Sequence, residues 1–227
     1  MKKNKKYYLY EMNTTFLNVV SIIIMVFMIL LTYFVIKVKN PSFECIGSSF
    51  IWTYCLMIPY FILHEIFHSI AYVLHGANFK NITYGIHLEK GILCCLCKQN
   101  ISRKNILISL VYPFVFLGVI TYILGIIFNN YTLLILSSMN IAGCSGDLMM
   151  FYSLVKLKEY EYSEFDDPTS FGLYTSEDLS KRKLPCMKNK GETDKLEIKD
   201  LTKIRISKES IIIIIAFLLI GIIGYFL

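Results

Sequence analysis

Two histidines and a glutamate stand in an apolar stretch with a spacing that suits metal chemistry. The residues are His64, Glu65 and His68, in the order His-Glu-Ile-Phe-His. On an α-helix, side chains four residues apart share one face, so both imidazoles can bind the same metal ion. Glu65 lies about 100° around the helix from His64, which suits a general base acting on a water molecule at the metal. The pattern predicts a catalytic zinc centre.

A carboxylate elsewhere in the chain is a candidate third ligand. The five apolar segments defined below contain only four Asp, Glu, His, Lys or Arg residues, namely His64, Glu65, His68 and Asp147. Ionisable groups inside a membrane are costly and mark functional sites. Two carboxylates without a basic partner would be poorly tolerated, and one divalent cation would neutralise both. The alternative is a pair of neutral carboxylic acids, hydrogen-bonded within the bundle.

The histidine pair and Asp147 are expected at a similar membrane depth. The midpoint of the pair lies 16 residues after Phe50, and Asp147 lies 16 residues after Tyr131. At about 1.5 Å per residue, one metal ion is within reach of both helices. His75 competes as third ligand, but it lies about 10 Å beyond His68 on a continuous helix. Three protein ligands and an open position for water are typical of catalytic zinc.

Small and polar residues precede Asp147. The run at 140–147 reads Asn-Ile-Ala-Gly-Cys-Ser-Gly-Asp, a composition that favours close packing of membrane helices. Asn140 and Gly143 share a helix face with Asp147. Asn140 is a candidate for hydrogen-bonding a substrate backbone or a developing oxyanion. Equally, it is a candidate for joining two helices through a hydrogen bond.

The apolar segments predict an all-α membrane protein with five transmembrane helices in a bundle. A membrane-spanning helix needs about 20 apolar residues, and the segments lie near 16–36, 50–74, 105–128, 131–155 and 211–227. Pro113 is expected to kink the third. Of the 227 residues, 55% are hydrophobic and 18% charged, which excludes a disordered chain and disfavours an ordinary soluble domain. The first segment is too long for a signal peptide, so we expect a retained helix.

The basic residues predict how these helices are oriented. The segment before the first helix and the four connections carry 4, 2, 5, 0 and 12 Lys or Arg residues in turn. We therefore expect a multi-pass protein of the cell membrane. The positive-inside rule places its amino terminus in the cytoplasm and its carboxyl terminus on the outer side of the membrane. The net charge of +6 reflects this topology rather than a nucleic-acid site.

The polar segments complete the predicted organisation. Residues 1–15 are expected to be a basic cytoplasmic amino terminus, 16–175 the helical metallopeptidase-like domain, and 176–210 a polar cytoplasmic linker before the last helix at 211–227. Residues 81–86 and 92–96 are β-prone and flank a Glu-Lys-Gly turn, which predicts a small cytoplasmic β-hairpin between helices two and three. Its cysteines, Cys94, Cys95 and Cys97, lack a second C-x-x-C pair, so a structural role is favoured over metal binding.

On these motifs the chain resembles the putative zincin peptidases, a family of integral membrane proteins of bacteria. The matching features are residues 64–68, the cysteine-containing hairpin, residues 140–147 and residues 167–174. More distantly the site is similar to site-2 proteases, which place H-E-x-x-H in one helix and an aspartate ligand in a later one. That similarity implies Asp147 as the third ligand. Site-2 proteases follow their aspartate with glycine, whereas here Gly146 precedes Asp147.

The predicted function is that of an integral membrane zinc metallopeptidase. His64, His68 and Asp147 would hold Zn²⁺, and Glu65 would act as general base in hydrolysing peptide bonds at or within the membrane. Its expected partners are the lipid bilayer and a peptide or membrane-protein substrate; the sequence carries no signal for an oligomeric state. Two alternatives remain open. One is a non-catalytic membrane scaffold or immunity-type protein with a structural or vestigial metal site. The other is a haem- or metal-handling membrane protein, which an absorption spectrum would distinguish.

Overall fold

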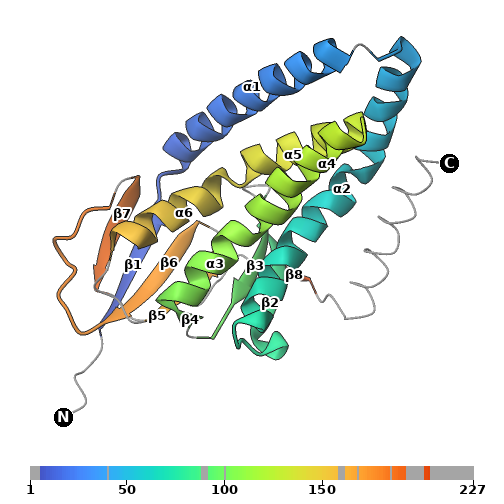
Figure 1. Ribbon diagram of the computed structural model, residues 1–227. Helices are drawn as coiled ribbons and strands as arrows, with labels where there is room; N and C mark the ends of the chain where they lie inside the picture. Colours follow the sequence, from blue (N-terminus) through green and yellow to red (C-terminus); the bar gives the residue numbers. More distant parts are fainter. Residues whose placement is uncertain are drawn as a thin grey trace. The chain divides into compact units, whose positions relative to one another are not determined.

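The computed structural model is mostly helical, with two small sheets (Figure 1). It describes residues 6–39, 41–87, 92–99, 101–157, 162–167, 169–184, 186–192 and 202–204. The chain divides into two compact units. Within the described residues, the sheet unit comprises residues 6–18, Phe67–Tyr112 and the described part of 146–204, and the helical unit comprises Val19–Ile66 and Pro113–Ser145.

Within the described residues, three helical stretches are long and apolar enough to cross a membrane. They are α1 (Thr14–Lys39), the Gly47–Leu74 part of α2 (Phe43–Leu74), and Arg103–Ile127, which joins α3 (Arg103–Pro113), η2 (Phe114–Ile120) and α4 (Thr121–Ile127). These correspond to the first three predicted spans, and they are consistent with a membrane protein. The predicted span at 211–227 lies outside the described residues.

The fourth predicted span is broken rather than continuous. Helix α5 (Tyr131–Gly143) and helix α6 (Ser145–Lys156) pass the length and hydropathy test together, but they are bent by 43° at Cys144. The backbone of Cys144, with φ −68° and ψ 0°, leaves the α-helical region and ends α5. Asp147 therefore lies in the first turn of a new helix.

The helical unit is held together by an apolar cluster and a buried polar contact. Met28 of α1 is buried with Tyr122 of α4 and Leu134 of α5. Thr32, one turn after Met28, hydrogen-bonds through its hydroxyl to the hydroxyl of Ser138 at 2.9 Å. Such small hydroxyl residues let membrane helices approach and satisfy one another's polar atoms.

The type of helix changes after Pro113, and the predicted kink there stays a prediction. The helix continues after it as a π-helix, η2, over Phe114–Ile120. The wider turns of a π-helix are rare and occur frequently at functional sites. In η2 the Leu117 carbonyl accepts a hydrogen bond from the hydroxyl of Tyr60 at 2.6 Å. Because Tyr60 lies one turn before His64, this bond ties the histidine-bearing part of α2 to η2.

Close helix packing occurs at glycines other than those the sequence suggested. A Cβ at Gly118 would lie 2.8 Å from Ile141 Cγ1, and a Cβ at Gly125 would lie 3.1 Å from the Leu134 backbone nitrogen. Gly143 has no neighbour within 4 Å that an added Cβ would meet. The expectation of close packing at 140–147 is therefore wrong for Gly143, and η2 and α4 supply the small residues that α5 packs against.

The sheet unit contains a five-stranded antiparallel sheet that the sequence analysis did not predict. Its strand order is β4-β5-β6-β1-β7 (Figure 1). The strands are β1 (Lys6–Met12), β4 (Ile101–Ser102), β5 (Tyr162–Asp167), β6 (Ser170–Thr175) and β7 (Met187–Glu192). Four fully buried side chains form its centre: Tyr8, Tyr10, Phe171 and Leu173. The all-α class is corrected accordingly, because the predicted amino-terminal segment supplies the strand β1 and the predicted linker supplies β7.

The predicted hairpin strands are present in the sheet unit. Strands β2 (Ile82–His87) and β3 (Ile92–Cys97) pair antiparallel, and β8 (Thr202–Ile204) adds to the other edge of β2. The turn at 88–91 lies outside the described residues, and the cytoplasmic position of the hairpin stays a prediction. The hydroxyl of Tyr84 on β2 donates to Ser69 Oγ on α2 at 2.5 Å. This bond fixes the hairpin one residue from His68.

Candidate metal centre

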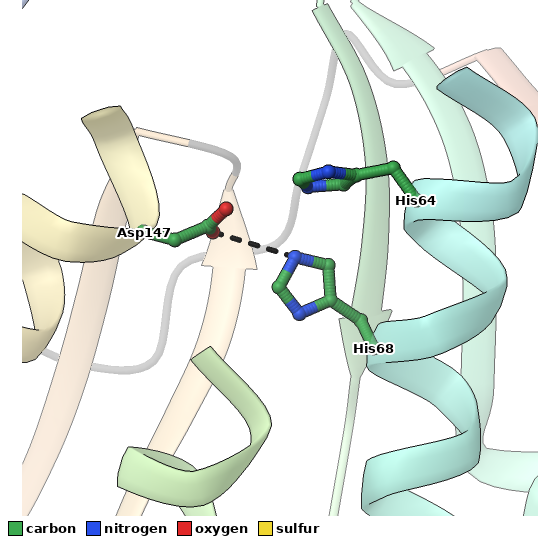
Figure 2. A group of neighbouring side chains, drawn as sticks. All are labelled: His64, His68 and Asp147. Carbon is green, nitrogen blue, oxygen red and sulfur yellow. Dashed lines mark ion pairs between the residues drawn. The ribbon is translucent and has the colours of Figure 1, made fainter. Parts of the chain in front are cut away.

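Helices α2 and α6 supply the three side chains of the candidate metal centre. The ligand atoms of His64, His68 and Asp147 all lie within 4.8 Å of one another. Figure 2 shows the two imidazoles on successive turns of α2, with the carboxylate of Asp147 facing them. Among the described residues, this is the group of histidine, cysteine and acidic side chains arranged to hold a metal ion. The depth match of the histidine pair with Asp147 is consistent with this grouping.

Both ring nitrogens of His68 lie near an oxygen atom. Its Nδ1 lies 2.9 Å from the backbone carbonyl oxygen of Ser109, which can only accept, so Nδ1 carries the hydrogen. Its Nε2 lies 3.4 Å from Asp147 Oδ1. The side chain is buried, with 5% of the residue exposed. A histidine that donates from Nδ1 to a carbonyl and presents Nε2 to the site has the tautomer and orientation of a metal ligand.

The Nδ1 of His64 also has a hydrogen-bond partner, which is a side chain rather than a backbone carbonyl. Its Nδ1 lies 2.8 Å from Asn140 Oδ1. The amide nitrogen of Asn140 donates to the Pro113 carbonyl at 3.3 Å and faces Cys144 Sγ at 3.6 Å. Because that nitrogen is committed to the carbonyl, the oxygen faces His64, and Nδ1 of His64 is the donor. Both histidines therefore hold their hydrogen on Nδ1.

The remaining predicted residues have different positions. Glu65 follows His64 on α2 and is half-buried, and its role as general base stays a prediction. His75 lies outside the metal-ligating group, and its Nδ1 is 2.7 Å from the Ala71 carbonyl oxygen. Asn140 is 1% exposed; its oxyanion role stays a prediction, and the structure instead joins its amide to His64 and Pro113.

The three hairpin cysteines are buried and are not members of the group formed by His64, His68 and Asp147. Cys94, Cys95 and Cys97 are each less than a tenth exposed. Cys94 faces the Gly85 carbonyl oxygen across the hairpin at 3.5 Å. Burial within a sheet fits the structural role that the sequence favoured over metal binding.

Two contributors to the centre were missed from the sequence because they act through backbone atoms. The carbonyl oxygens of Ser109 and Pro113 hold His68 and Asn140 respectively. Residue types report side-chain chemistry, and every residue has a carbonyl, so neither stood out. The proline was the available signal, because it removes an N–H from a helix and so alters the hydrogen bonding of the carbonyl four residues before it.

Residues 56–162 match the family described as putative zincin peptidase. The family resemblance seen in the sequence is thereby confirmed over this segment, which contains all three side chains of the centre. No curated protein and no solved structure matches the chain.

The donor set fits zinc, the ion that a zincin requires. Two imidazole nitrogens and a carboxylate oxygen are the ligand types of catalytic zinc sites with three protein ligands. The fit rests on the gathering of the three ligand atoms within 4.8 Å and on the Nδ1 partners of both rings. Both Nε2 atoms then carry a lone pair, which is the form in which imidazole binds a metal.

Proposed function

We propose that this chain is an integral membrane zinc metallopeptidase that hydrolyses peptide bonds at or within the membrane. The observation that carries the proposal is the gathering of His64, His68 and Asp147 inside a segment that matches a zincin peptidase family. Long apolar helices around that segment support a membrane setting.

In this proposal His64, His68 and Asp147 hold the ion and Glu65 moves the proton. When bound, zinc lowers the pKa of water to about 7 and polarises a carbonyl. Glu65 accepts the proton of the attacking water and delivers it to the departing amine, as a general base and then a general acid. Asn140 and the Ser109 carbonyl hold the two rings in place for this chemistry.

The proposal extends to topology, with the amino terminus in the cytoplasm and the carboxyl terminus outside. It is supported by the 4, 2, 5, 0 and 12 distribution of basic residues. A reporter fused after Leu227 should be active only outside the cytoplasm. A fusion active only inside would contradict five spans and leave the metal chemistry untouched.

The deciding experiment separates the base from the ligands. The full chain is purified in lipid nanodiscs, its zinc is measured, and its cleavage of a panel of co-expressed single-span membrane proteins is compared among variants. Glu65→Gln should keep zinc and lose about 10²–10⁴-fold in cleavage rate, because a positioned proton-transfer group contributes that much. Asp147→Ala should lose most of the zinc, because the site then has only two protein ligands.

The matched control is His75→Gln, which removes a histidine from the same region of the chain without touching the three ligands. It should keep both zinc and cleavage. Equal cleavage by wild type and Glu65→Gln would make the site structural rather than catalytic. Full zinc in Asp147→Ala together with its loss in His75→Gln would show that the third ligand is wrong.

A further inference from the structure

Both histidines of the centre are anchored to backbone carbonyls near the end of α3, at Ser109 and at Pro113. His68 donates from Nδ1 to the Ser109 carbonyl at 2.9 Å. His64 faces Asn140 Oδ1, and the amide nitrogen of Asn140 donates to the Pro113 carbonyl at 3.3 Å. Ser109 and Pro113 are four residues apart in α3, which is the spacing of an α-helical hydrogen bond.

The Ser109 carbonyl is available to His68 because of what Pro113 lacks. In an α-helix, the carbonyl of residue 109 accepts a hydrogen bond from the N–H of residue 113. Proline has no N–H, so this donor is missing from the sequence itself. Ser109 is fully buried, and a buried carbonyl without a donor is costly. His68 Nδ1 supplies the donor that the helix cannot.

The carbonyl of Pro113 anchors the second histidine through an intermediary. Pro113 is the last residue of α3, and the π-helix η2 begins at the next residue. At this change of helix type its carbonyl accepts from Asn140 Nδ2. That bond orients the amide so that its acceptor atom, Oδ1, faces His64 Nδ1. Gly118 permits the approach, since a Cβ there would lie 3.6 Å from Asn140 Nδ2 and 2.8 Å from Ile141.

We infer that Pro113 is a positioning residue that sets the tautomer of His68 through its missing N–H. The carbonyl at the same position, which any residue would supply, orients Asn140 toward His64. Each ring is thereby held with its hydrogen on Nδ1 and its lone pair on Nε2. The functional meaning of the inference rests on the proposed metal site, but the tautomers are a property of the metal-free chain and are measured there.

The test reads the tautomers directly. The full chain, labelled with ¹⁵N and ¹³C at histidine, is placed metal-free in lipid nanodiscs at a pH well above the ordinary histidine pKa of about 6.5. Side-chain chemical shifts then distinguish hydrogen on Nδ1 from hydrogen on Nε2. In the wild type, His64 and His68 should both be Nδ1–H. A wild-type His68 in the Nε2–H form would overturn the inference.

Two variants should move the two histidines separately. Pro113→Ala restores the N–H at position 113, which competes for the Ser109 carbonyl, so His68 should shift to the Nε2–H form that free histidine favours. His64 should stay, because the carbonyl at 113 remains. Asn140→Leu should shift His64 to the Nε2–H form and leave His68 in the Nδ1–H form. Zinc affinity should fall about 10–100-fold in each variant, as it does when a partner of a metal-binding histidine is lost.

The controls separate the N–H from the shape of the proline ring. Pro59→Ala, the matching change at the proline inside α2, should leave both tautomers unchanged. A backbone ester at 113, introduced as the α-hydroxy analogue of alanine, has no ring and no N–H and should keep His68 in the Nδ1–H form. If Pro113→Ala fails to fold, this ester variant alone decides.

The inference fails if His68 stays Nδ1–H in Pro113→Ala, if Pro59→Ala shifts it equally, or if the ester behaves like alanine. Failure of the proposed function looks different. A chain that binds no zinc and cleaves nothing, yet shows the predicted tautomers and their separate shifts, would contradict the peptidase and leave the role of Pro113 intact.

Discussion

Helix α1 and strand β1 follow one another in the chain and bury their side chains in opposite ways. Of the 26 residues of α1, only Met28 and Thr32 are buried, and apolar side chains such as Phe27 are more than half exposed. Strand β1 has seven residues and buries four of them, three of which are tyrosines. Apolar character and burial are therefore uncoupled in this protein.

The difference teaches which solvent each region is built for. Exposed apolar surface on a helix as long as α1 suits lipid, where the backbone is satisfied within the helix and the side chains need no cover. The five-stranded sheet has the distribution expected of a region in contact with water, with buried aromatic side chains at its centre and charged side chains exposed. Two cross-strand ion pairs, Lys6–Glu192 and Glu11–Lys190, have N–O distances of 2.7 Å each and side chains that are more than a third exposed.

The largest expected effect comes from placing charge on α1. Ile23→Lys with Phe27→Lys puts two ammonium groups on one exposed face of the helix. Each costs about 2.5–3.5 kcal/mol at the centre of a membrane helix. The amount of full chain that resists alkaline extraction from membranes should fall sharply. The control, Ser176→Lys with Glu177→Lys, changes exposed residues after β6 and should extract like wild type. Equal extraction of the two double variants would contradict the assignment of α1 to lipid.

A smaller effect is expected from adding one methyl group to the sheet. A Cβ at Gly172 of β6 would lie 1.9 Å from the hydroxyl oxygen of Tyr7, whose ring crosses the strand at this point. Gly172→Ala should therefore destabilise the sheet by about 1–3 kcal/mol, the usual cost of overpacking. Hydrogen exchange of the β1 and β6 amides measures this loss.

The control for Gly172→Ala uses a glycine with open space around it. Gly47→Ala in α2 meets nothing within 4 Å and should leave sheet protection unchanged. The double variant Gly172→Ala with Tyr7→Ala should recover part of the loss, since it removes the clashing ring. Undiminished protection in Gly172→Ala would show that Tyr7 does not need the space.

The smallest effect concerns Asp178, which lies after β6. Hydrogen bonds from the backbone and side chain of Ser180, and then from the Tyr8 hydroxyl, hold the pKa of Asp178 at about 2. Tyr8→Phe removes only the last of these, so the pKa of Asp178 should rise part of the way to its ordinary value of about 3.9. Carboxyl ¹³C shifts followed against pH measure the change.

The sign of the stability effect follows from the lowered pKa. A carboxyl group whose pKa is lowered by folding stabilises the folded state at pH values above its ordinary pKa. This contribution is lost as the pH falls towards 2. Wild type and Tyr8→Phe should therefore differ in stability at neutral pH and differ less in acid. A constant difference across the acid range would assign the effect to packing of the Tyr8 ring instead.

The first three spans and the grouping of His64, His68 and Asp147 could be predicted because their signals are local. The spacing of His64 and His68 is read within one turn, and the depth of Asp147 follows from counting along an apolar run. The bend at Cys144 was not predicted, because residues 131–155 are apolar enough to pass as one span. The hairpin strands were predicted for the same local reason, β-prone residues on both sides of a turn.

The five-stranded sheet could not be predicted, because its pairings join distant parts of the chain. Tyr8 of β1 pairs with Leu173 of β6 and with Glu192 of β7. The amino-terminal lysines satisfy the positive-inside rule, which accounts for this segment without a strand. In β7, exposed residues such as Lys188 and Lys190 alternate with partly buried ones. In the sequence, this polar strand resembles an ordinary solvated segment.

The position of β1 between β6 and β7 has a consequence for biosynthesis. Strand β1 leaves the ribosome before both of its neighbours in the sheet, Ser170–Thr175 and Met187–Glu192, which are made only after the whole metal centre has been translated. During that interval β1 has none of its native strand partners, and an unpaired edge is a hazard for aggregation. The sheet therefore forms after the three candidate ligands have been made. Its formation pairs the strand that precedes them in the chain with the strands that follow them.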